Sequence, residues 1–177
     1  IELEMRNPEP NIYLPTAEIK FDVSTGKFSI NDDFAEHPVV YVSWYGAVIF
    51  CNWLTEMRDG NTQNLVYTNI NDNWDDDDTI EDITKTGYRL PSLYEWQYAA
   101  RYRGNDSTNT VSGFSNPYYT KGNSASGAAS SCSNESATRI FGWFQADPDM
   151  VHGTCLMPVA LKRANFLGLY DMSGNVK

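Results

Sequence analysis

The chain has 177 residues, of which 41% are hydrophobic and 14% aromatic, so it carries enough apolar surface for one folded domain and does not have the composition of a disordered protein. Its formal net charge of -10 repels the phosphates of nucleic acids and the anionic surface of membranes, which excludes nucleic acid as the expected partner. No segment reaches the roughly 18 consecutive apolar residues of a membrane-spanning helix, so no membrane insertion is expected.

The first predicted element is a β-hairpin. Two short alternating stretches, AEIKFDV at 17–23 and GKFSI at 26–30, lie on either side of the polar residues Ser24 and Thr25. Alternating apolar and polar residues around a polar turn are typical of two paired antiparallel strands.

A long helix is predicted over residues 44–58. Ser43 stands just before the apolar-periodic segment and is a natural N-cap, and Gly60 follows the last periodic residue, where glycine commonly ends a helix. Apolar residues cover most of the circumference of this helix, so we expect it to lie in the core. Its predicted buried side chains include Trp44, Cys51 and Trp53, with Cys51 as an inert buried thiol.

Residues 61–86 form an acidic, amide-rich loop with one strand-like piece at 65–68. Four of its residues fall at the oxygen-ligand positions of an EF-hand calcium loop: Asn71, Asn73, Asp75 and Asp82. However, Asp76 replaces the glycine that the loop needs, and Asp82 replaces the bidentate glutamate. The pattern therefore favours a solvated loop.

A second helix is predicted to begin after Ser92. Ser92 and Glu95 have the spacing of a capping box, in which each side chain accepts a hydrogen bond from the backbone of the other residue. The apolar spacing along the helix places Leu93 and Trp96 in the core. Because Glu95 serves its own cap, we do not expect it to be catalytic.

The remaining sequence is expected to be irregular. Residues 104–139 are rich in Ser, Asn, Gly and Thr and are predicted to form a surface insertion. RIFGWF at 139–144 predicts a short aromatic strand, and LMPVAL at 156–161 a strand-like piece.

Cys132 and Cys155 lie in polar, loop-like sequence. A disulfide between them that pins the insertion and two free thiols are both compatible with the sequence. If the bridge forms, the protein is exported.

Residues that suggest catalysis are scarce. His37 and His152 have no partner at metal-ligand or nucleophile-base spacing, and there is no phosphate-binding glycine loop. No catalytic residue is therefore predicted in this chain, and whether the full protein is an enzyme stays open.

Three blocks, in this order, resemble the signature of the formylglycine-generating enzyme (sulfatase-modifying factor) family: HPVVYVSWYGAVIFCNWL at 37–54, GYRLPSLYEWQYAAR at 87–101 and RANFLGLYDMSGNV at 163–176. The resemblance implies an α+β fold, a variant of the C-type lectin fold in which two helices pack on small antiparallel sheets and much of the chain is loop. It also implies a single domain over 1–177, with a C-terminal part expected beyond Lys177.

The resemblance carries over one metal site and no catalytic site. Enzyme members bind copper through two cysteines in the part expected beyond Lys177, and none of the three cysteines here matches them. The turn in the third block holds a structural calcium in enzyme members, which implies calcium ligands at Asp171, Gly174 and Val176. Hard oxygen ligands from a tight turn suit calcium. A metal-free turn rich in Asp and Asn is the alternative.

The leading functional hypothesis is a non-catalytic ligand-binding or surface-display domain. Variable ligand-binding proteins of diversity-generating retroelements, which are similar to this family, work in this way. The alternative is a copper-dependent formylglycine-generating oxidase or a related iron-dependent sulfoxide synthase, with catalytic residues after Lys177, and a third is an accessory domain of a larger protein. The expected partner is a protein or another extracellular ligand, and the expected location is extracellular, on a cell surface or on a virion.

Overall fold

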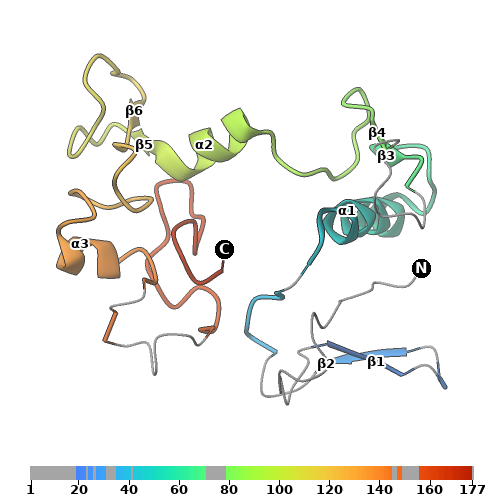
Figure 1. Ribbon diagram of the computed structural model, residues 1–177. Coiled ribbons are helices and arrows are strands. Elements are labelled where there is room, and N and C mark those ends of the chain that lie inside the picture. The colour runs from blue at the N-terminus through green and yellow to red at the C-terminus, as the bar shows by residue number, and fades with distance from the viewer. Residues whose placement is uncertain are drawn as a thin grey trace. The chain divides into compact units, whose positions relative to one another are not determined.

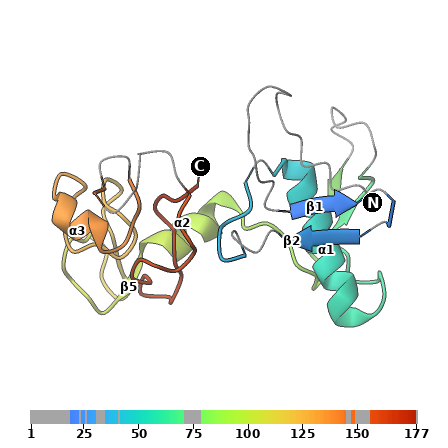
Figure 2. The same ribbon diagram turned by 90° about the horizontal axis from the view of Figure 1, so that it is seen from below.

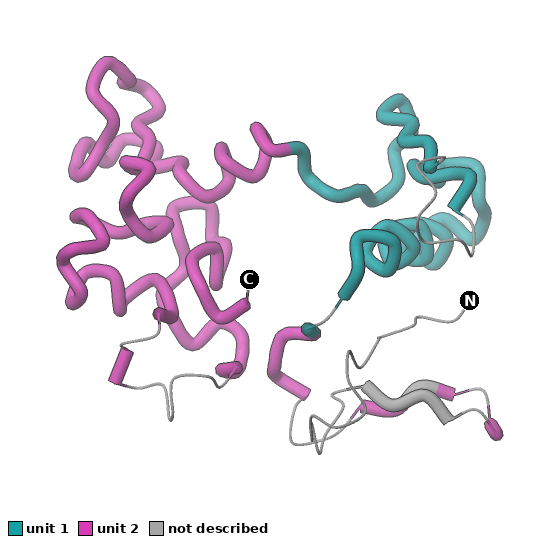
Figure 3. The backbone as a smooth tube through the Cα atoms, viewed as in Figure 1, with its two compact units in different colours: residues 1–13, 40–92 teal, residues 14–39, 93–177 magenta. Residues whose placement is uncertain are grey.

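The computed structural model describes residues 19–22, 24–25, 27–30, 35–40, 42–70, 79–144, 147–148 and 156–176. They fall into two units (Figure 3). The first unit lies within residues 40–92, and the second combines residues of 14–39 with residues of 93–177. The single domain over 1–177 stays a prediction.

Three helices and three two-stranded antiparallel sheets are present in the described residues (Figures 1 and 2). The first unit holds α1 (Trp44–Asp59), β3 (Tyr67–Thr68) and β4 (Ile80–Glu81). The second unit holds β1 (Ile19–Asp22), β2 (Lys27–Ile30), α2 (Leu93–Arg101), β5 (Tyr102–Gly104), β6 (Tyr118–Tyr119) and α3 (Glu135–Arg139). The predicted α+β class with small antiparallel sheets is thus confirmed.

The predicted hairpin is present. β1 pairs with β2 in antiparallel register, with Ile19 opposite Ile30 and Asp22 opposite Lys27. Ser24 and Thr25 lie in the turn between the strands and are exposed, as the polar turn sequence predicts.

Both ends of α1 agree with the sequence analysis. The Ser43 side chain accepts a hydrogen bond from the Gly46 N–H at 3.0 Å, which satisfies one of the backbone donors that the first turn leaves open. Gly60 takes the left-handed conformation at φ 67° and donates its N–H to the Glu56 carbonyl at 2.8 Å.

The core of the first unit is small. Val48 and Cys51 on α1 pack with Val66 and Tyr67, and all four are buried. Burial raises the pKa of the Cys51 thiol, so the neutral form is favoured, and the prediction of a buried Cys51 is confirmed.

Polar side chains of α1 fix the neighbouring backbone. The Asn52 amide donates to the Tyr67 carbonyl at 2.6 Å and accepts from the Tyr67 N–H at 3.2 Å. The buried Thr55 hydroxyl accepts from the Tyr88 N–H at 2.8 Å and donates to the Cys51 carbonyl at 2.9 Å. These bonds hold two separate segments against one face of α1.

The prediction that Trp44 and Trp53 lie in the core is wrong for this structure, because 51% and 48% of their surfaces are exposed. The buried stripe of α1 runs through Val48, Cys51 and Thr55. Trp53 follows Cys51 by two positions, and residues two apart on a helix do not share a face. Trp44 stands four residues before Val48, at the N-terminal end of this stripe, where it meets Tyr45 and Tyr67 edge to face.

Asn165 connects three segments of the second unit. Its side-chain N–H groups donate to the Ala99 carbonyl at 2.8 Å and to the Ser126 hydroxyl at 3.0 Å. Its side-chain oxygen accepts from the N–H groups of Leu167 and Leu169 at 2.9 and 3.1 Å. This buried amide therefore ties the last turn of α2 to the C-terminal segment, which lies alongside α2 in Figures 1 and 2.

The predictions for Leu93 and Trp96 are also wrong, because 67% and 47% of their surfaces are exposed. The buried position of α2 lies at its C-terminal end, where Ala100 is buried and its carbonyl accepts from the Ser126 hydroxyl at 2.5 Å. The last turn of the helix thus packs into the unit, while the apolar side chains of its first turn stay exposed.

Most side chains of residues 104–139 are exposed or half-buried, and the predicted surface insertion stays a prediction, but part of this stretch contributes to the core of the second unit. Thr120, Ala125, Ser126 and Ala128 are buried there. A Cβ at Gly127 would lie 2.8 Å from the Phe141 ring, so the small side chains of this stretch permit a close approach of backbone and ring. At 125–128, the small side chains thus allow dense packing.

No strand forms at 139–144 or at 156–161 in the described residues, contrary to the sequence prediction. Asn134 caps α3 by accepting from the Ala137 N–H at 3.1 Å, so Arg139 ends a helix. Trp143 is buried, and its backbone N–H donates to the Ser173 carbonyl at 3.1 Å. The aromatic residues of this segment favour a strand. In the structure, the segment instead begins at the end of the helix that Asn134 caps, and the backbone bond from Trp143 to Ser173 holds it in place.

Three of the four EF-hand-like positions, Asn71, Asn73 and Asp75, lie outside the described residues. The fourth, Asp82, accepts hydrogen bonds from the backbone and hydroxyl of Thr84 at 3.0 and 2.6 Å.

None of the helices in the described part of the protein has the length and apolar content that a membrane crossing requires.

We expect Asn165→Ala to lower the free energy of unfolding by about 2–5 kcal/mol, because it leaves several buried polar groups without partners. Urea unfolding followed by tryptophan fluorescence measures the change. Asn105→Ala, at an exposed asparagine with no side-chain hydrogen bond in the described structure, is the control and should stay within about 0.5 kcal/mol of the parent protein. An equal effect of both substitutions would contradict the anchoring role of Asn165.

Candidate functional site

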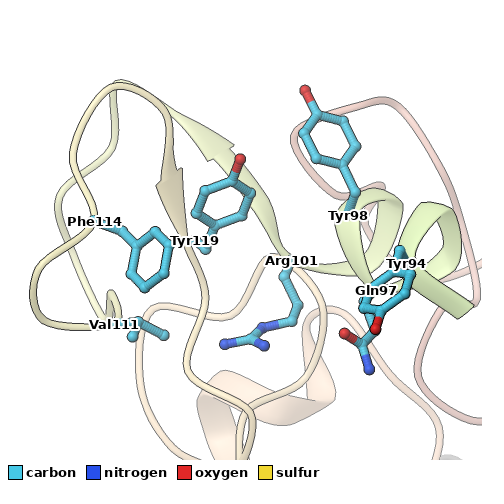
Figure 4. Close-up of a pocket in the computed structure, with 7 residues that line it drawn as sticks. All are labelled: Tyr94, Gln97, Tyr98, Arg101, Val111, Phe114 and Tyr119. Atoms are coloured by element: carbon cyan, nitrogen blue, oxygen red, sulfur yellow. The ribbon is translucent and has the colours of Figure 1, made fainter.

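A pocket of about 540 Å³ opens on the second unit (Figure 4). Its lining comes from α2, from the loop between β5 and β6, and from β6 itself. The lining residues are Tyr94, Gln97, Tyr98, Arg101, Val111, Phe114 and Tyr119.

The α2 side of the pocket is one face of the helix. Tyr94, Gln97, Tyr98 and Arg101 follow each other at the spacing i, i+3, i+4 and i+7, which places them on one side of a 3.6-residue turn. Figure 4 shows them along the helix, with Arg101 extending toward the loop that carries Val111.

Aromatic rings form the opposite wall. The Phe114 and Tyr119 rings meet edge to face, with centroids 5.7 Å apart and an interplanar angle of 86°. Tyr119 also contacts Tyr98 on α2, at 6.0 Å and 64°. Edge-to-face pairs are favourable beyond simple burial, so the rings support one another across the pocket.

Arg101 is the one charged residue in the lining of this pocket. Its Nε donates to the Thr120 carbonyl at 2.8 Å, which fixes the plane of the guanidinium group. No further hydrogen bond or ion pair of the Arg101 side chain occurs among the described residues. Figure 4 shows the guanidinium group between Val111 on the loop and Gln97 on the helix.

A buried ion pair anchors the loop that carries Val111 and Phe114. The Arg103 guanidinium, almost fully buried, pairs with the Asp106 carboxylate and donates to the Thr108 hydroxyl at 2.9 Å. Burial raises the pKa of Asp106, but hydrogen bonds from Thr108 and Arg103 outweigh this effect, so the pKa lies below its ordinary value. The carboxylate therefore stays charged and holds the start of the loop.

The lining of the pocket combines apolar and polar groups. It offers four aromatic rings, three of which carry phenol hydroxyls, together with one valine, one amide and one guanidinium. Several apolar walls with a few placed polar groups are typical of a ligand site.

A second feature is the turn at 171–176, which the sequence singles out for calcium. Asp171 accepts a hydrogen bond from the Ala160 N–H through Oδ2 at 2.8 Å, whereas its Oδ1 is buried and has no hydrogen-bond partner among the described residues. The carbonyl oxygens of Gly174 and Val176 accept no hydrogen bond in the described structure. The three predicted ligands thus share one turn and have unused oxygen atoms.

Neighbouring segments fix the shape of this turn. A Cβ at Gly174, which has φ 100°, would lie 1.9 Å from the Trp143 carbonyl oxygen, so only glycine fits. The Asn175 amide accepts from the Met157 N–H and donates to the Met157 carbonyl, both at 2.9 Å.

A buried carboxylate oxygen without a partner is costly unless a cation or a donor satisfies it, so the chemistry of this oxygen atom suits a hard cation such as calcium. No group of three or more His, Cys, Asp or Glu side chains that could hold a metal occurs in the described residues. A calcium ion here would therefore depend on backbone carbonyls, as the sequence analysis expects.

The predicted disulfide stays a prediction. Cys132 is exposed and is a free thiol in the structure, and Cys155 lies outside the described residues. His152 lies outside them as well.

Sequence reasoning missed the aromatic pocket. Its signal was present in YEWQYAAR at 94–101, where two tyrosines, a glutamine and an arginine share a helix face, and in the aromatic residues of GFSNPYY at 113–119. Only the backbone that brings the helix and the loop together shows that these two motifs belong to one site.

Residues 13–177 match the family described as "Sulfatase-modifying factor enzyme 1-like domain" (FGE-sulfatase). The chain belongs to this family. It is also 31% identical over 150 residues to "Chaperone protein LppX" of Paenibacillus barcinonensis, an alignment that covers 80% of this chain and 50% of that protein. The chain thus spans about half the length of this relative. No solved structure was found to match it.

The low pKa of Asp106 predicts a defined pH dependence. Its stabilising contribution is fully present above its unfolded pKa of about 3.9 and is lost as the pH falls through the lower folded pKa. We expect Asp106→Asn to be less stable than the parent at neutral pH and to lose part of the acid sensitivity of the thermal midpoint.

Thermal midpoints measured over a series of pH values test this expectation. Glu56→Gln is the control, because it removes one exposed carboxylate from α1. A parallel pH profile for Asp106→Asn and the parent would show that the ion pair with Arg103 does not hold the loop.

Proposed function

We propose that this chain is a non-catalytic ligand-binding domain, that the aromatic pocket of the second unit is its binding site, and that a segment of another protein is its ligand. The observation that carries the proposal is the exposure of rings in the pocket wall: 81% of Tyr94 and 56% of Phe114 is accessible to solvent. Apolar surface gathered in a concave site gains free energy when a ligand covers it.

The name of one relative supports a protein ligand. The Paenibacillus relative is named a chaperone protein. Aromatic residues are the commonest anchors of protein recognition, since they offer a large contact area with few rotatable bonds. A pocket with walls of Tyr and Phe suits a large apolar side chain of a partner.

The alternative hypothesis, an oxidase or a sulfoxide synthase, depends on residues expected beyond Lys177. Of the cysteines that the structure describes, Cys51 is buried in the core of the first unit and Cys132 is exposed, and neither lines the pocket. The display of a variable surface and an extracellular location stay predictions of the sequence.

Immobilised arrays of short peptides test the binding proposal. We expect the protein to retain peptides that contain aromatic or large aliphatic residues, and Phe114→Ala to weaken this binding about tenfold, because it removes one wall of the pocket. Phe50→Ala, at an exposed ring on α1, is the matched control and should leave binding unchanged.

Two results would overturn the proposal. Equal binding by the parent and Phe114→Ala would place the ligand elsewhere. Copper-dependent oxygen uptake with a cysteine peptide would favour the oxidase alternative.

The proposed domain includes a structural calcium ion at the turn formed by Asp171, Gly174 and Val176. The support is the buried, unpaired Oδ1 of Asp171, together with two carbonyl oxygens of the same turn that are unused in the described structure. When bound, calcium would neutralise the carboxylate and stiffen a turn that already contacts Trp143 and Met157.

We expect calcium to raise the thermal midpoint of the protein and EDTA to reverse the increase, because a ligand that binds only the folded state stabilises it by about 2.7 kcal/mol at a concentration 100 times its Kd. Asp171→Asn should abolish the response, and magnesium should not replace calcium. An unchanged midpoint with calcium would favour the metal-free turn.

A further inference from the structure

The cations of the second unit differ in how their charge is used. Arg103 pairs with Asp106, and the Lys162 ammonium group lies 2.7 Å from the buried Asp147 carboxylate. Arg101 has no carboxylate partner among the described residues, although it lies in a pocket of aromatic rings. Its charge is therefore available to a ligand.

The Arg101 guanidinium group is positioned in advance. The bond from Nε to the Thr120 carbonyl occupies one edge of the group and leaves the two Nη atoms for a second partner. Two parallel N–H donors match the two oxygens of a carboxylate, and Gln97 adds a neutral amide at the same end of the pocket.

Building on the proposed function, we propose that the pocket binds a peptide carboxylate next to a large apolar side chain. The carboxylate pairs with Arg101, and the apolar side chain lies against Phe114 and Tyr119. The carboxylate comes from the C-terminus of a polypeptide or from an Asp or Glu side chain.

The charge balance favours a carboxylate over a phosphate. Phosphopeptide sites gather several arginines around a group of charge near -2. The lining of this pocket holds one cation, and the protein as a whole carries a net charge of -10. A single negative charge is matched by Arg101, whereas a second would be repelled by the surrounding protein.

The aromatic walls strengthen this pairing. Once a ligand covers the rings, less water surrounds the guanidinium group, and an ion pair is stronger where less water screens it. An apolar side chain attached to the carboxylate would close the pocket over the pair. The two halves of the proposed ligand thus support each other's binding.

Four peptides with the same backbone length test the proposal on the full protein: acetyl-Gly-Gly-Phe with a free C-terminus, the same peptide as an amide, acetyl-Gly-Glu-Phe-amide, and acetyl-Gly-Gly-phosphotyrosine-amide. Isothermal titration calorimetry with each peptide gives its Kd. We expect at least one carboxylate peptide to bind about tenfold more tightly than the neutral amide, and the tighter one identifies the source of the carboxylate.

Arg101→Gln should remove this preference and leave the carboxylate peptides with the affinity of the amide. Lys121→Gln is the matched control, because it makes the same change of net charge at an exposed site outside the pocket and should keep the preference. If Arg101→Gln does not fold, the comparison of carboxylate and amide on the parent protein decides the question.

Equal affinity of the parent for carboxylate and amide peptides would overturn this inference alone, provided that Phe114→Ala still weakens both. Tightest binding of the phosphotyrosine peptide would overturn it in favour of a phosphate ligand. Failure of every peptide to bind would overturn the proposed function together with the inference.

Discussion

The second unit depends on one buried amide, that of Asn165. Its side chain uses two donors and one acceptor oxygen for four hydrogen bonds, and its partners belong to α2, to the loop at Ser126 and to the C-terminal segment. Apart from α2, these segments have little regular structure of their own, so a buried polar group with all its bonds satisfied takes the place of a large apolar core. The fold is therefore specified by a few directional bonds.

This anchor also positions the aromatic pocket. Asn165 holds the Ala99 carbonyl, and Arg101 follows two residues later, at the end of the same helix. From there the Nε of Arg101 reaches the Thr120 carbonyl next to β6, and the ion pair between Arg103 and Asp106 fixes the loop on the far side. Helix, strand and loop thus meet around one guanidinium group, and a structural network sets the geometry of the proposed ligand site.

The sequence predicted best those features whose causes are local. The N-cap at Ser43, the end of α1 at Gly60 and the hairpin at 19–30 follow from side chains that bond or bend their own neighbourhood. The sequence predicted least well which positions of each helix are buried. The expected core at Trp44, Trp53, Leu93 and Trp96 is about half exposed or more, because hydrophobicity alone does not say which face of a helix meets a partner.

By itself, the sequence determined the family, the places of the long helices and the turn at Asp171, since each depends on residues close together along the polypeptide. Only the tertiary structure decided that part of the Ser- and Gly-rich stretch packs inside the second unit, and that Tyr94, Arg101 and Phe114 line one pocket. The physical reason is that both features depend on backbone segments that approach closely from distant positions, and no local pattern of side chains encodes that approach.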